Sequence, residues 1–274
     1  MKLSIILIAY DMARDYEVIL VDNGSPTPLD PQSWSHVDVP VRLVRIKDAS
    51  HSPASAINVA LAQATGEITC LMIDGAHLLT PGVFRMALAS FAAFESPVVA
   101  TRYFGPDTQN DSIVQGYSKT VEDQLLQDIN WPDDGYRLYE IGTPLRAGAE
   151  NINWLNRMFE SNCLFMLRSV FQEIGGADEQ FTSPGGGLIN SDIFKRAADA
   201  SGVTPVQLIG EGSFHQLHGG TTTNVSAEER NARVAKFRQE YAEIRGHDKI
   251  MTEKTFHFMG HLPTQASKIP RLRW

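Results

Sequence analysis

Three polar segments of the chain each follow directly on a short apolar run. They are Ala9-Tyr10-Asp11, Asp22-Asn23-Gly24-Ser25 and Asp74-Gly75-Ala76-His77. Carboxylate oxygens are suitable ligands for Mg²⁺ and Mn²⁺, and a bound cation can neutralise negative charge on a departing group. Aspartates gathered from these segments could therefore support reactions in which an anion leaves.

Four further polar residues stand out by their position. Asn58 lies within a predicted helix and Asp192 near the start of another, while His215 and His218 are three residues apart. In a strand the two histidines would face opposite sides, so one ion could not bind both unless the strand bulged. Asn58 and Asp192 also have structural alternatives, a local side-chain hydrogen bond and favourable contact with a helix N-terminus.

Several functional classes find no support in the sequence. No G-x-G-x-x-G segment follows the first predicted strand and no Walker lysine motif occurs, which excludes the usual dehydrogenases and P-loop enzymes. The net charge of −8 argues against nucleic acid as the main partner, because binding phosphates requires clustered Lys and Arg.

The sequence also indicates a cytoplasmic protein. The apolar run that begins the chain is too short for a signal peptide, and no run approaches the ~20 residues of a membrane span. Cys70 and Cys163 each lie within an apolar run, as expected of buried free thiols in a reducing compartment. We therefore expect no integral membrane segment.

The elements that must position the polar segments are those of an α/β fold. Short, nearly continuous apolar runs are typical of strands buried on both faces of a parallel sheet. They occur at Leu3–Ala9, Tyr16–Val21, Val41–Ile46, Ile68–Ile73 and Val98–Phe104. Helical patterns that begin at Ser52-Pro53 and Thr80-Pro81 predict βαβ units in a doubly wound sheet. Ligands bind such sheets beyond the carboxyl ends of the strands, so we expect the three polar segments to converge on one edge.

The connection between the first two predicted strands does not fit this plan. Only Tyr10 to Asp15 separate them, whereas a parallel crossover needs about a dozen residues or more. Either these strands are not parallel neighbours, or a segment between Met12 and Asp15 is missing from the chain. From the sequence we favour the second alternative.

The later part of the chain is less regular. Residues 105–160 are polar and rich in turn signals, with a helix predicted over 118–129. The elements predicted beyond them are strands at 161–167, 204–209 and 212–217 and a long helix from a capping box at Ser226 to Arg245. The simplest division is a domain over residues 1–222 and a helical C-terminal extension, residues 223–274, packed on it.

Four blocks of the sequence, in this order, resemble family 2 glycosyltransferases. They are Ser4–Tyr10, Tyr16–Ser25, Ala54–Asp74 and Glu173–Ala197. Within the last block, Gly-Gly-Ala-Asp-Glu-Gln-Phe at 175–181 is similar to the family's Gly-Gly-Phe-Asp-Glu-x-Phe. The resemblance implies the GT-A fold, a Rossmann-like α/β domain with a mostly parallel central sheet flanked by helices.

The resemblance implies a site for a nucleotide sugar in the first hundred residues. Ala9, Tyr10 and Asp22 would hold the nucleotide base and ribose. Asn58 matches the asparagine of the family's Arg-Asn-x-Gly helix. Asp22 has an alternative role as a turn cap before Asn23-Gly24.

Asp74-Gly75-Ala76 corresponds to the Asp-x-Asp motif of the family. The resemblance implies that Asp74 and Gly75 contact the donor and that Asp74 binds a divalent cation, Mn²⁺ or Mg²⁺. Ala76 stands where the second aspartate is usual, which removes an expected ligand, and His77 could compensate only if the turn bent it inward. His218 resembles a late histidine ligand of some relatives, its alternative being a histidine bonded within the fold.

A carboxylate that deprotonates the acceptor is also implied. Aligning Asp192 and Arg196 with the family's acidic and arginine positions places Ile189-Asn190 where Glu-Asp is usual. Asp192 is then the nearest substitute and the predicted catalytic base.

The implied function is transfer of a sugar, with inversion, from a nucleoside-diphosphate sugar such as a UDP-sugar to a sugar, lipid or small-molecule acceptor. A rival from another class is a non-catalytic nucleotide- or sugar-binding relative, because Ala76 and Asn190 occupy positions that are usually acidic. A nucleotidyltransferase shares the sheet but usually has a glycine-rich loop after the first strand, which this sequence lacks. The oligomeric state is left open, a homo-oligomer included.

Overall fold

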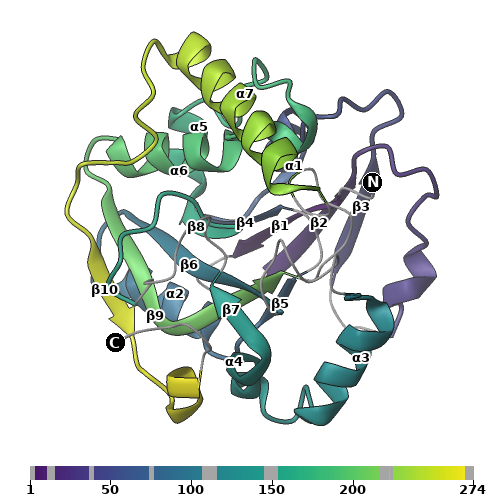
Figure 1. Ribbon diagram of the computed structural model, residues 1–274. Helices are drawn as coiled ribbons and strands as arrows, with labels where there is room; N and C mark the ends of the chain where they lie inside the picture. Colours follow the sequence, from purple (N-terminus) through teal and green to yellow (C-terminus); the bar gives the residue numbers. More distant parts are fainter. Residues whose placement is uncertain are drawn as a thin grey trace.

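The computed structural model describes residues 4–10, 16–36, 40–73, 77–106, 116–144, 154–215, 222 and 225–268. One mixed sheet runs through it, with helices on both faces (Figure 1). Its strands are β1 (Ser4–Tyr10), β2 (Tyr16–Asp22), β3 (Val41–Arg45), β4 (Ile68–Ile73), β5 (His77–Leu79), β6 (Pro97–Pro106), β7 (Gly142–Pro144), β8 (Cys163–Leu167), β9 (Thr204–His215) and β10 (His257–Gly260). Their order in the sheet is β10-β9-β6-β8-β4-β1-β2-β3, with β5 paired to β9 and β7 to β6.

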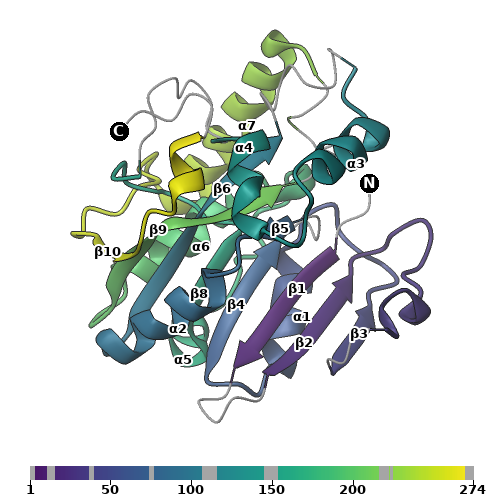
Figure 2. The same cartoon turned by 90° about the horizontal axis from the view of Figure 1, so that it is seen from below.

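The helices divide between the two faces and one edge of the sheet. Those on one face are α1 (Ala54–Gln63), α5 (Arg168–Glu173), α6 (Ile189–Asp199) and α7 (Ala227–Arg245). The opposite face is covered by α2 (Val83–Ala93), while α3 (Lys119–Asp128) and α4 (Leu138–Ile141) gather near β5 and the end of β9 (Figure 2). Within the described ranges, no helix is both long and apolar enough to cross a membrane.

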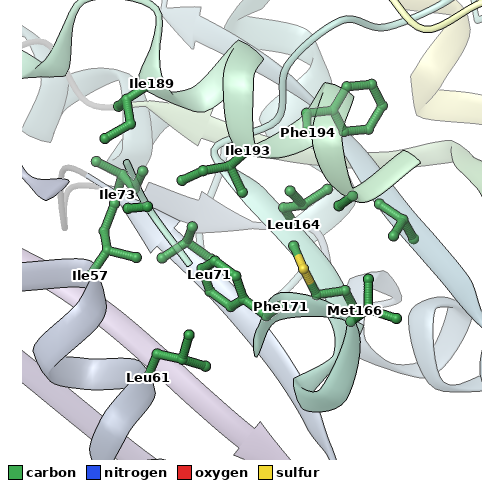
Figure 3. Packing of buried hydrophobic residues seen from close by; sticks show 14 of the residues in the cluster. Ile57, Leu61, Leu71, Ile73, Leu164, Met166, Phe171, Ile189, Ile193 and Phe194 are labelled. Atoms are coloured by element: carbon green, nitrogen blue, oxygen red, sulfur yellow. The ribbon is translucent and has the colours of Figure 1, made fainter. Parts of the chain in front are cut away.

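Strand β4 shows how the sequence pattern produces these layers. All of its residues are buried. Leu71 and Ile73 pack with side chains of α1 and α6 (Figure 3), whereas Cys70 and Met72 belong to the cluster under α2. Because both faces of β4 are covered, an apolar residue is required at nearly every position, and this confirms the predicted strand.

Strand β1 runs antiparallel to both of its neighbours, β2 and β4. Ser4 lies opposite Asp22, and Tyr10 lies opposite Tyr16. The short connection between the strands explains this direction, because a hairpin needs only a few residues and a parallel crossover about a dozen. The structure thus shows the first alternative, strands that are not parallel neighbours, which we did not favour from the sequence. Residues 11–15 themselves lie outside the described residues.

The α/β class with a helix-flanked sheet is confirmed, but the expectation of a mostly parallel sheet is wrong. Strand β8 is antiparallel to both β4 and β6, and β1 adds two further antiparallel pairs. The pairs β2–β3, β6–β9 and β9–β10 are parallel. The apolar runs predicted the positions of the strands correctly. The sequence of a strand that is buried on both faces does not show, however, whether the strand runs parallel or antiparallel to its neighbours.

The two strands predicted at 204–209 and 212–217 form the single strand β9. Gly210 lies within it at a φ of 74°, a backbone conformation that side-chain-bearing residues rarely adopt. A Cβ at Gly210 would lie 1.5 Å from the carbonyl oxygen of His261. Glycine therefore allows the chain after β10 to cross directly over β9.

The C-terminal extension is more than a helix packed on the domain. Helix α7 begins as predicted after Ser226, whose side chain accepts a hydrogen bond from the N–H of Glu229, and ends at Gly246. Tyr241 of α7 and Phe256 after it belong to the main core. Strand β10 then joins the sheet beside β9, so the extension contributes a strand as well as the predicted helix.

Candidate functional site

Strands β2, β4, β6 and β9 end at the same edge of the sheet, where β1 and β8 begin. We call this edge the carboxyl rim and define it by Asp22, Ile73, Tyr103, Asn162 and His215. In one half of the rim, the start of β1 lies between the ends of β2 and β4. Its second half follows from β8, which begins opposite the end of β4, and from the parallel pair β6–β9.

Some of the predicted polar segments begin at the carboxyl rim, but one of them lies at the opposite edge of the sheet. Asp22 lies on it, and so does Ile73, the residue that directly precedes Asp74. Asp74 and Gly75 lie outside the described residues. Ala9 and Tyr10 are at the opposite edge, because β1 is reversed. The expectation that all three segments converge is therefore wrong for the first of them.

Asp22 is almost fully buried, with 1% of its surface exposed. Its carboxylate accepts hydrogen bonds from the N–H groups of Ser25 at 2.8 Å and Leu29 at 3.4 Å, and it pairs with Arg45 at 2.8 Å. Burial raises the pKa of this carboxyl, but the N–H donors and the Arg45 guanidinium hold it, on balance, below its ordinary value. Asp22 is thus an ionised carboxylate that fixes the turn after β2. This is the turn-capping role that the sequence offered as the alternative to nucleotide binding.

Asn58 connects α1 to the glycine-containing turn after α5. Its amide nitrogen donates to the carbonyl of Ala177 and to Glu179 Oε1, both at 2.9 Å, and its amide oxygen accepts from the N–H of Ala177 at 2.9 Å. The side chain would also lie 2.4 Å from a Cβ at Gly176. These contacts explain why the Gly-Gly motif and the asparagine occur together, and they give Asn58 a structural role that is not the local bond considered from the sequence.

Asp192 is buried in α6 with 1% exposure. One oxygen accepts from Arg245 Nε at 2.6 Å, and the other accepts from Arg196 Nε at 2.7 Å and from a terminal nitrogen of Arg245 at 2.8 Å. The partnership with Asp192 raises the pKa of Arg245, and Asp178 adds to that effect. Two arginines therefore pair with Asp192, an environment that suits an anchor between α6 and α7 better than a proton acceptor.

The start of α6 carries polar residues at the carboxyl rim. Asn190 donates to Asn162 Oδ1 at 2.8 Å, and Ser191 Oγ donates to Glu160 Oε2 at 3.1 Å. The hydroxyl of Tyr103 in β6 donates to the other oxygen of Glu160. Glu160 was not among the site residues predicted from the sequence, which either follow strands or lie in helices. Glu160 precedes an antiparallel strand, and the available signal was a polar Glu-Ser-Asn triplet directly before an apolar run.

The histidines near the rim are only partly described. His77 in β5 has both ring nitrogens occupied: Nε2 lies 3.0 Å from the carbonyl oxygen of Ile73, and Nδ1 lies 2.7 Å from Ser213 Oγ. Its ring is 5.0 Å from that of His215, which lies opposite it in β9. His77 is therefore not oriented to replace the carboxylate missing at position 76, and His218 lies outside the described residues.

A divalent cation remains a prediction. Among the residues that the structure describes, no three His, Cys, Asp or Glu side chains form a group that could hold a metal ion. Both proposed ligands, Asp74 and His218, are outside those ranges, so no ligand set can be assigned from the described side chains.

Comparisons with known proteins place the chain in a family. Curated proteins give no match. Among solved structures it is similar to S. aureus TarS 1–349 in complex with UDP, with 13% identity, a TM-score of 0.46 and coverage of 82% of this chain and 62% of that chain. It is also similar to TarS 1–349 in complex with UDP-GlcNAc, with 14% identity, a TM-score of 0.46 and coverage of 82% of this chain and 57% of that chain. The chain therefore spans less than two thirds of either structure. The model described as Glycosyl transferase family 2 matches residues 7–175. Because that match covers more than half of the chain, the protein belongs to glycosyltransferase family 2.

Proposed function

We propose that the protein transfers a sugar from a nucleoside-diphosphate sugar to an acceptor hydroxyl, with inversion at the anomeric carbon. Family membership supports the donor class. The observation that carries the proposal is the position of Asp22 and Ile73 on either side of the start of β1, at the carboxyl rim. Asp74 directly follows Ile73 in the sequence, and in the proposal both acidic residues act at the edge where α/β sheets bind ligands.

The residues divide into roles by their surroundings. In the proposal the turn that Asp22 holds contacts the nucleoside, while Asp74 and Gly75 contact the diphosphate. A divalent cation bound by Asp74 would neutralise charge on the departing diphosphate. Ala9 and Tyr10 are left out of the proposed site because they lie at the other edge of the sheet.

Calorimetric titration with UDP-, GDP- and dTDP-sugars, each with Mn²⁺, tests the donor. We expect at least one of them to bind, and Asp74→Ala to weaken that binding by about tenfold or more, since it removes a charge next to the diphosphate. Asp123→Ala is the matched control, because the Asp123 side chain is 57% exposed in α3 and pairs with Lys119 across one helical turn. The absence of binding by all three donors would refute the proposal, and unchanged affinity in Asp74→Ala would remove that residue from the site.

A second candidate is a relative that binds the nucleotide sugar without transferring it. The arginine pairs of Asp192 and the amide at Asn190 favour this alternative, since neither side chain is an available carboxylate. Turnover separates the two functions. Donor binding without release of nucleoside diphosphate, over a panel of sugar, lipid and small-molecule acceptors, would identify the binding protein.

A further inference from the structure

The start of α6 places a different carboxylate at the carboxyl rim. Asn190 is bonded to Asn162, and Asp192 faces away into two arginines. Glu160 lies beside these residues, bonded to Ser191 in the first turn of the same helix. We propose that Glu160 is the base that removes the proton of the acceptor hydroxyl, an assignment that rests on the proposed function.

The contacts of Glu160 hold the carboxylate in place without neutralising it. Ser191 Oγ lies 3.1 Å from one oxygen, and the hydroxyl of Tyr103 donates to the other. Both partners are neutral hydroxyls, and a carboxylate offers about four lone-pair positions, so acceptor capacity remains at each oxygen. Asp192, by contrast, is held by two cations.

Glu160 is also accessible. It is partly exposed, whereas Asp192 has 1% of its surface exposed. It precedes β8, whose first residue pairs with Met72 near the end of β4. The Glu160 carboxylate is bonded to Tyr103 of the carboxyl rim, and the proposed donor would bind at the same rim. A base must come within hydrogen-bond reach of the hydroxyl that it activates, and this position meets that requirement better than the site of Asp192.

The proposed step transfers one proton to Glu160 and one glycosyl group to the acceptor. The acceptor O–H bond breaks and its proton passes to a carboxylate oxygen of Glu160. The acceptor oxygen forms a bond to the anomeric carbon, and the bond from that carbon to the diphosphate oxygen breaks with both electrons leaving on the nucleoside diphosphate. Ser191 and Tyr103 act as positioning residues that orient the carboxylate.

The test compares release of nucleoside diphosphate by the full chain, at saturating donor and over a range of pH, with donor affinity measured by calorimetry. We expect Glu160→Gln to lower kcat by about 100-fold or more, the usual contribution of a general base, while the donor Kd changes less than twofold and the circular dichroism spectrum is retained. Glu253→Gln is the matched control, because that side chain is 89% exposed and distant in sequence.

Each outcome has a distinct meaning. Retention of more than a third of kcat by Glu160→Gln overturns the assignment while leaving the proposed function intact. Loss of activity in folded Asp192→Asn, together with an active Glu160→Gln, instead restores Asp192 as the base. A wild-type protein that binds donor but releases no product overturns the transfer activity, and the assignment with it.

Discussion

At the scale of single residues, the same side-chain types serve different purposes because their partners come from distant parts of the chain. Asp22 is paired with Arg45, 23 residues away, and Asp192 with Arg245, 53 residues away. The sequence singled out both carboxylates as candidate site residues. Their partners could not be read from it, since nothing local in the sequence links an aspartate in α6 to the last residue of α7.

Asn58 allows a structural role and a binding role to be separated. Asn58→Ala removes three hydrogen bonds and leaves the buried N–H of Ala177 without its acceptor. We expect the free energy of unfolding to fall by about 1–3 kcal/mol, measured by urea denaturation, with the nucleotide affinity of the folded variant unchanged. Gln124→Ala, on the exposed side of α3, should change stability by less than about 0.5 kcal/mol.

A different result for this residue would also be informative. If folded Asn58→Ala lost nucleotide affinity while keeping its stability, the binding role implied by the family resemblance would stand, and the contacts with Ala177 would be incidental.

At the scale of elements, the apolar runs predicted where strands lie and the caps predicted where helices begin. Ser226 starts α7 as expected, and the runs at β2, β3 and β4 fall within a residue or two of their predicted bounds. Strand direction was not predictable in the same way. An apolar run carries no sign of its orientation, and only the length of the connection before Tyr16 pointed to the hairpin that β1 and β2 form.

Gly210 couples β9 to the chain that follows β10. Gly210→Ala would place a Cβ 1.5 Å from the carbonyl oxygen of His261, so the chain after β10 must move. We expect a loss of more than about 2 kcal/mol, because the strain of a positive φ adds to the clash. Gly202→Ala is the control, since Gly202 also has a positive φ of 72° but no atom within 4 Å of the added Cβ. Its cost should be near 1 kcal/mol, and equal losses in denaturant titrations of the two variants would mean that the crossing is dispensable.

At the scale of the whole molecule, one core joins the beginning of the chain to its end. Ile19 of β2, Ile57 of α1 and Phe256 after α7 belong to the same cluster. Two buried or partly buried carboxylates directly follow members of this core, Asp22 after Val21 and Asp178 after Ala177. The first pairs with Arg45 and the second with Arg245.

Acid should therefore unfold the protein in one step. Burial raises the pKa of Asp178, but the Gln180 N–H and Arg245 lower it below its ordinary value overall, as the corresponding contacts do for Asp22. A lowered pKa contributes stability above the unfolded value of about 4, and that stability is lost as the pH falls through the folded pKa. We expect near- and far-ultraviolet circular dichroism to change together below pH ~4.

Asp178→Asn provides the matched variant for this titration. The variant lacks one of the two carboxyl groups whose pKa is lowered. Its free energy of unfolding should therefore be lower at pH 7 and should depend less on pH between about 4 and 2. Two separated transitions in the wild type would instead divide the chain into independent units and contradict a shared core.

The all-apolar strand β4 has a consequence for synthesis. It ends at Ile73, and β8, which covers one of its edges, begins only about 90 residues later. At roughly 5–20 residues per second, the ribosome leaves that edge open for roughly 5 to 20 s. An unpaired apolar strand can template pairing with other chains, so residues 68–73 are the segment of the nascent polypeptide that most requires a chaperone.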